Sequence, residues 1–243
     1  MIDEPSGDRD RNWAIAKGVA IGLGIAVLGI GPWAILAPLN ARVRPDLPWA
    51  AAVTALLLVL LAWWLAGGGP PRASRDARWR ALRLWPDKRT RDAGRWSAET
   101  WMLILAFALL TALWIAVTSR QPAPDLSQYP TTAFRISAFM MTPLVAGVAE
   151  EMAYRGYMLS RLERFGPRIA IGVTSLTFAA MHLVHGIGVL WLLPGFFAVS
   201  VLYCLLVRRM GSILPAMILH TLGDAAYLYF SVLGGDLGLL VVR

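Results

Sequence analysis

The chain has 243 residues, of which 57% are hydrophobic and 16% are charged, and its net charge is +8. Soluble domains carry about 25% charged residues, so the composition excludes an ordinary soluble protein. The basic residues gather in short connections between apolar runs, which is how membrane topology is encoded, and this argues against nucleic-acid binding. Cys204 is the only cysteine, so the sequence offers neither an internal disulfide nor a thiolate metal site.

Seven apolar runs are each long enough to cross a hydrocarbon core of about 30 Å as a helix. They cover residues 14–37, 48–66, 98–119, 134–160, 169–187, 189–207 and 213–233. We therefore expect an all-α polytopic membrane protein with about seven transmembrane helices.

Ionisable side chains are almost absent from the first three spans but recur in spans four, five and seven. We accordingly divide one membrane domain into two parts. Residues 1–133 form a scaffold with the N-terminal tail, three spans and the basic loop 72–95, and residues 134–243 form a four-helix unit that carries the site. The loop 72–95 is interpreted as a topogenic connection, with an interfacial helix on anionic lipid as the alternative.

The distribution of basic residues predicts the orientation of the chain. The N-terminal tail and every second connection hold 17 of the 23 basic residues, the opposite set holds 5, and Arg155 lies within a span. Basic loops stay in the cytoplasm, so we expect a cytoplasmic N-terminus and an extracytoplasmic C-terminus. We expect an integral protein of a bacterial inner (plasma) membrane.

Span four contains two adjacent carboxylates and an arginine. Each charge at a helix centre costs roughly 2.5–3.5 kcal/mol, so Glu150, Glu151 and Arg155 need partners or a function. Glu151 and Arg155 lie four residues apart on one helical face, in the favourable order for an ion pair. Glu150 points about 100° away from Glu151 on the helical wheel, so it must face a group other than Arg155.

The remaining polar residues of the spans recur at helical spacing. Span five carries Phe178 and His182 on one face, and span seven carries His220 and Asp224 on one face. At 1.5 Å per residue, Glu150, His182 and His220 lie about 15, 20 and 10 Å from the predicted cytoplasmic ends, which lets the three spans converge on one buried pocket. His185, near the outer boundary, is interpreted as a packing residue.

A glutamate, two histidines and an aspartate form a set that can activate water. Glu150 can act as general base, and His182 and His220 can orient the water or donate to an oxyanion. The same side chains, Glu150, His182, His220 and Asp224, can instead bind zinc and leave one position for water. The sequence has no His-Glu-x-x-His motif, which excludes a zincin arrangement, and it leaves open whether the site holds zinc or no metal.

These residues resemble the motifs of the CAAX-protease and bacteriocin-processing (CPBP, or Abi) family of intramembrane proteases. The family pattern is Glu-Glu-x-x-x-Arg, Phe-x-x-x-His and His-x-x-x-Asn/Asp on separate transmembrane helices. The matching residues are Glu150, Glu151, Arg155, Phe178, His182, His220 and Asp224, within about 134–233. The resemblance implies an all-helical membrane enzyme whose first glutamate activates water for peptide hydrolysis, with the other motif residues in the catalytic site and Phe178 in support.

One motif position differs from the members that act on prenylated CAAX proteins, in which an Asn is thought to help form the oxyanion hole. Asp224 stands there in this chain. An ionised Asp cannot donate a hydrogen bond, so Asp224 must be protonated, orient His220 or bind metal. The prenylated substrate is therefore not carried over to this protein.

We hypothesise an intramembrane endopeptidase that acts on membrane-associated proteins or peptides, with its pocket opening towards the cytoplasmic half. Two alternatives remain: a non-catalytic relative that acts as a membrane partner or immunity protein, and a proton-coupled transporter with Glu150, His182 and Asp224 as a relay. The single polar cluster and the lack of an inverted repeat argue against the transporter.

Overall fold

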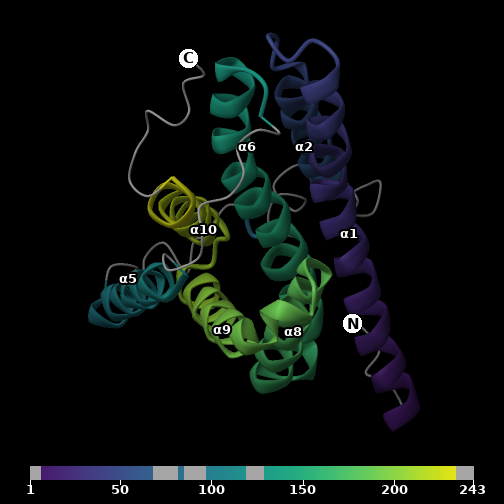
Figure 1. The fold of residues 1–243 in the computed structure, drawn as a ribbon. Helices are drawn as coiled ribbons and strands as arrows, with labels where there is room; N and C mark the ends of the chain where they lie inside the picture. Colours follow the sequence, from purple (N-terminus) through teal and green to yellow (C-terminus); the bar gives the residue numbers. More distant parts are fainter. Residues whose placement is uncertain (1–6, 68–81, 85–96, 119–128, 234–243) are drawn as a thin grey trace.

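The structure is a computed structural model that describes residues 7–67, 82–84, 97–118 and 129–233. The regular elements in these residues are all helical (Figure 1). They are α1 (Asp8–Arg42), α2 (Trp49–Gly67), α5 (Ala98–Thr118), α6 (Thr132–Glu150), η2 (Glu151–Leu159), α7 (Ser160–Leu162), η3 (Glu163–Phe165), α8 (Pro167–Met181), η4 (His182–His185), η5 (Ile187–Leu192), α9 (Leu193–Met210), α10 (Leu214–Tyr227) and η6 (Leu228–Val232).

Each of the seven predicted spans contains a helix, and the protein is an all-α polytopic membrane protein. Five helical segments of the described chain are long and apolar enough to cross a bilayer: Asp8–Arg42, Ala98–Thr118, Thr132–Phe165, Pro167–His185 and Ile187–Met210. The second predicted span is a shorter apolar helix, Trp49–Leu65. The seventh combines α10, which has 14 residues, with the π-helical turn η6.

The structure corrects two span boundaries. The fourth span does not end at residue 160 but continues to Phe165, and its stretch Glu151–Leu159 is π-helical. Spans five and six are separated by the 3-10 turns of residues 182–192, so His182 caps the end of α8 instead of lying inside a helix. The interfacial-helix alternative for loop 72–95 falls outside the described residues, except for 82–84.

Prolines and caps explain several helix starts. Thr131 caps α6, because its hydroxyl accepts a hydrogen bond from the backbone N–H of Phe134 at 3.2 Å. Helices α8, α9 and α10 each carry a proline in their first turn, where the missing N–H is not needed. Gly211 ends α9 with φ +65°, a left-handed conformation that glycine adopts without strain, and α10 begins three residues later.

The helices pack around the fourth span. Helix α1 packs against α2, α6 and η2, and α10 packs against α6 (Figure 1). Helices α8 and α9 pack against each other, and α5 lies against α9 and α10. The buried core therefore surrounds η2, whose residues Met152, Ala153 and Met158 have no exposed surface.

Ion pairs draw several basic segments to one end of the bundle. The Glu163 carboxylate accepts a hydrogen bond from Nε of Arg208 at 3.0 Å and also forms an ion pair with Arg83. Arg209 contacts Glu99 at 3.3 Å. The predicted topology assigns these arginines to one side, and the structure brings them together.

The contact between α6 and α10 depends on a glycine. A Cβ atom at Gly147 would lie 2.9 Å from the backbone nitrogen of Thr221 and 3.0 Å from the carbonyl oxygen of Met217, both closer than packing allows. The backbones of α6 and α10 therefore touch one turn before the paired glutamates.

Gly147→Ala should lower the free energy of unfolding by about 1–3 kcal/mol, because the methyl group overpacks this contact. Gly172→Ala in α8 is the control, since a Cβ there meets nothing within 4 Å, and it should preserve or slightly raise stability. Thermal unfolding of both variants in detergent measures the difference. An unchanged Tm for Gly147→Ala would contradict the close helix contact.

Candidate active site

The two adjacent glutamates lie where α6 passes into the π-helical stretch η2, and they have different surroundings. The Glu151 carboxylate accepts a hydrogen bond from Nη1 of Arg155 at 2.8 Å, and neither side chain is exposed. The predicted Glu151–Arg155 ion pair is therefore confirmed. Short π-helical insertions in α-helices are frequent at functional sites.

Arg155 is bound by groups from other helices. Its Nη2 donates to the Ser200 hydroxyl of α9 at 2.8 Å. The guanidinium carbon lies 4.6 Å from the ring centre of Phe178 and 5.0 Å from that of Tyr203. An arginine in an apolar interior needs such compensation, which here comes from one carboxylate, one hydroxyl and two aromatic faces.

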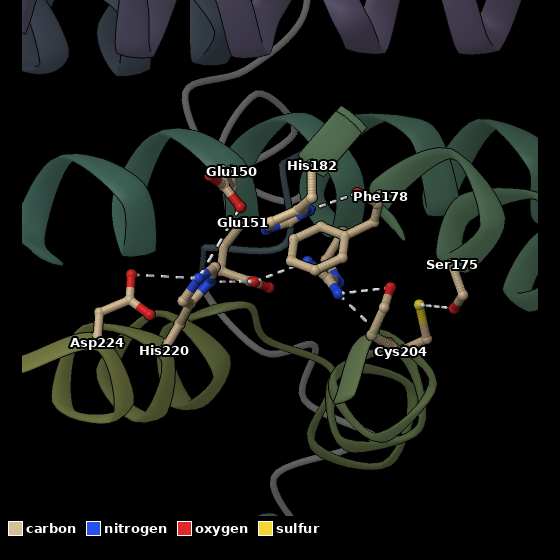
Figure 2. A network of polar contacts seen from close by, with 10 residues as sticks. Glu150, Glu151, Ser175, Phe178, His182, Cys204, His220 and Asp224 are labelled. Atoms are coloured by element: carbon tan, nitrogen blue, oxygen red, sulfur yellow. Dashed lines mark hydrogen bonds and ion pairs between the residues drawn. The ribbon is translucent and has the colours of Figure 1, made fainter. Parts of the chain in front are cut away.

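Glu151 also orients His220. The oxygen that binds Arg155 accepts a second hydrogen bond from Nδ1 of His220 at 2.9 Å (Figure 2). Nε2 of His220 then points between two other carboxylates, 3.9 Å from Glu150 and 3.7 Å from Asp224. Both separations exceed a hydrogen bond, which leaves Nε2 available to a bound water or substrate atom.

His182 is fixed by its own helix end and by aromatic rings. Nδ1 lies 2.9 Å from the carbonyl oxygen of Phe178, and a carbonyl can only accept, so Nδ1 carries the hydrogen. Phe196 stacks on the imidazole, with ring centres 3.6 Å apart, and Phe178 lies 4.9 Å away on centres. In the neutral form of His182, Nε2 therefore carries a lone pair.

A cavity of about 710 Å³ brings the candidate residues together. Its polar lining includes Glu150, His182, His220 and Asp224, while most other lining residues are apolar. His185, interpreted from the sequence as a packing residue, also lines it. Glu151 and Arg155 lie behind the wall.

The position of the cavity corrects one expectation. The sequence predicts a pocket that opens towards the cytoplasmic half, which is the half that holds the basic connections. The lining instead reaches Thr118 at the last residue of α5, Leu192 at the start of α9 and Tyr227 at the last residue of α10. These are the helix ends remote from the basic clusters, so the cavity occupies the other half of the bundle.

The carboxylates and histidines of the cavity are the residues for which the sequence leaves a zinc site open. Within the described residues, no three histidine, cysteine, aspartate or glutamate side chains are grouped closely enough to hold a metal. Glu150, His182, His220 and Asp224 share the cavity wall. The zinc set inferred from the sequence stays a prediction.

Sequence reasoning missed the contribution of α9. Ser200 binds Arg155, Tyr203 stacks on His220 with ring centres 5.2 Å apart, and Phe196 stacks on His182. The available signal was weak: Ser200 and Tyr203 lie three residues apart in an otherwise apolar run, which places them on one helical face.

Removal of the Glu151 charge should destabilise the fold. Glu151→Gln leaves Arg155 buried without its counter-ion and should lower the free energy of unfolding by about 3–5 kcal/mol. Glu150→Gln is the matched control and should keep its Tm, because Glu150 makes no hydrogen bond within the described chain. The double variant Glu151→Gln/Arg155→Met should recover part of the loss. Equal losses of Tm in the two single variants would contradict a structural role for Glu151 that Glu150 does not share.

Residues 131–226 match the family model described as Rce1-like, type II CAAX prenyl endopeptidase Rce1-like. No curated protein matches the chain. No solved structure matches it either. The matched residues run from the start of α6 to the end of α10 and contain every site residue predicted from the sequence. The match supports a function of the intramembrane-protease kind, and over residues 131–226 the chain is similar to the Rce1-like type II CAAX prenyl endopeptidases.

Proposed function

We propose that the protein is an intramembrane endopeptidase in which Glu150 activates the water that attacks a peptide bond. One observation carries this proposal. Glu150 lines the cavity with its side chain 16% exposed, while the adjacent Glu151 is fully buried and already engaged by Arg155 and His220. A general base needs a carboxylate that is free to accept a proton and can reach the reacting water.

The two histidines have separate tasks in this mechanism. His182 holds its hydrogen on Nδ1, so Nε2 can accept a hydrogen bond from the attacking water and orient it. His220 is held by Glu151, and when both of its nitrogens carry hydrogen it can donate from Nε2 to the oxyanion.

The chemical step conserves atoms and protons. The water oxygen bonds to the carbonyl carbon while Glu150 takes one water proton, which forms a tetrahedral oxyanion. The C–N bond then breaks, and the proton on Glu150 passes to the leaving nitrogen. One product ends in a new carboxyl group and the other in a new amine, and Glu150 is regenerated.

The cavity supports a membrane-associated protein or peptide as substrate. Its wall includes Trp33, Phe107, Trp114 and Phe196 beside the polar cluster, so an apolar segment can lie next to the reacting bond. Asp224 stands where CAAX members of the family carry Asn, and for this reason we do not extend the proposal to prenylated CAAX substrates.

Glu150→Gln should lower cleavage of a lipid-embedded peptide by roughly 10²–10⁴, because the amide keeps the shape but cannot accept the proton. Purified wild-type protein and the variant are compared in liposomes, and unchanged thermal unfolding shows that the fold is intact. Full activity of Glu150→Gln would refute the assigned base. A wild-type protein that cleaves no membrane peptide would favour the non-catalytic alternative.

Asp224→Asn tests the last motif position. We expect it to lose most activity, because a carboxylate 3.7 Å from Nε2 of His220 acts through its negative charge. Treatment of the wild-type enzyme with EDTA or phenanthroline then separates two roles. Loss of activity that zinc restores indicates a metal ligand, and insensitivity indicates an electrostatic role towards His220. A fully active, chelator-insensitive Asp224→Asn enzyme would show that Asp224 acts as a protonated hydrogen-bond donor.

A further inference from the structure

We propose that the cavity admits its substrate from the extracytoplasmic side of the membrane, so that the enzyme acts on peptide segments presented in that half of the bilayer. The proposal rests on the proposed function for the nature of the substrate. The side of entry follows independently from burial, packing and charge.

The exposure of the polar cluster increases in one direction. Arg155 and Glu151 are 0% exposed, His220 is 9% exposed, Glu150 is 16% exposed and Asp224 is 41% exposed, all as side chains. Arg155 lies one turn beyond Glu151 towards the end of the fourth span that contains Glu163. Asp224 lies one turn beyond His220, away from the start of α10. The cluster therefore opens away from the basic end of the bundle.

The basic end is closed by packing. The fourth span has no exposed side chain at three positions between the paired glutamates and Glu163, namely Met152, Met158 and Leu162. The segment 82–84 adds to this closure: Leu82 is buried, and its carbonyl oxygen lies so close to Gly156 that a Cβ there would meet it at 3.2 Å. Entry from this side would require these contacts to separate.

Two hydrogen bonds and an ion pair also hold segment 82–84 against the basic end of the bundle. The backbone N–H of Ile213 donates to the Arg83 carbonyl at 2.8 Å, and the Ser212 hydroxyl donates to the Leu84 carbonyl at 3.0 Å. The side chain of Arg83 pairs with Glu163. Segment 82–84 is thus bonded both to the turn before α10 and to the end of the fourth span.

The opposite end of the cavity reaches the ends of the helices. Its wall includes Thr118 of α5, Leu192 before α9 and Leu228 after α10, together with the turn residue Val184, which is 72% exposed. A substrate that enters here meets Asp224 and Glu150 first, and it does not have to displace the buried Glu151–Arg155 ion pair.

The charge distribution assigns a membrane side to each end. The closed end carries Arg83, Arg164, Arg208 and Arg209, which belong to the set of 17 basic residues, against 5 in the opposite set. By the positive-inside rule the closed end is cytoplasmic. The open end therefore faces outward, and the fitting substrates are exported peptides or membrane segments with the scissile bond in the outer half, not cytoplasmic tails.

Single cysteines test the side of entry. Cys204→Ala removes the only cysteine, and Thr111→Cys or Ala146→Cys then places one thiol in the cavity wall on α5 or α6. Arg164→Cys is the control at the closed end, where the side chain is exposed. A small, charged, membrane-impermeant methanethiosulfonate is applied to intact cells and to inverted membrane vesicles.

We expect the cavity thiols to react in intact cells and the Arg164→Cys thiol to react only in inverted vesicles. Cavity thiols that react only in inverted vesicles, or that react from neither side, would overturn the proposal, and the second cavity position guards against one misfolded variant. The labelling requires no cleavage, so its failure is distinguishable from failure of the proposed protease function.

Discussion

The buried Arg155–Glu151 ion pair is the constraint on which the rest of the structure depends. Two charges in an apolar interior need compensation from hydrogen bonds and other polar contacts. Ser200 of α9, the rings of Phe178 and Tyr203, and His220 of α10 supply this compensation in part. Nε of Arg155 and Oε2 of Glu151 are buried without a hydrogen-bond partner in the described residues. The pair thereby fixes three other helices relative to the fourth span.

This constraint separates the roles of two neighbouring residues with the same side chain. Glu151 is held by a cation and a histidine, so it serves to fix His220. Glu150 faces the cavity, where His220 approaches it only to 3.9 Å. A single carboxylate could not both neutralise Arg155 and remain free to accept a proton, which gives a physical reason for a pair of glutamates at this point.

The sequence was informative where the interaction is local. Glu151 and Arg155 lie four residues apart, and helical spacing alone indicated their pairing. The grouping of Glu150, His182, His220 and Asp224 around one pocket was also predictable, because ionisable residues in apolar spans must face each other. Their assignment to catalysis is a proposal that geometry supports.

The remaining features depend on contacts that spacing does not encode. Glu151 and His220 are 69 residues apart, and Ser200 is 45 residues from Arg155, so neither bond could be read from a helical wheel. The counted depths placed the site residues near the middle of the membrane, so they could not indicate the end of the bundle at which the cavity opens. The helices are in fact inclined to one another, as α5 and α10 are relative to α1 in Figure 1, and α8 ends at the site itself.

In the proposed mechanism Glu150 is the reactive carboxyl group and Glu151 is not. An apolar carbodiimide that partitions into membranes modifies accessible carboxyl groups, and peptide mass spectrometry locates the modified residue in the same sample used for the cleavage assay. We expect modification at Glu150, in parallel with loss of peptidase activity, and none at Glu151. Modification of Glu151, or complete modification of Glu150 with full activity, would contradict this mechanism.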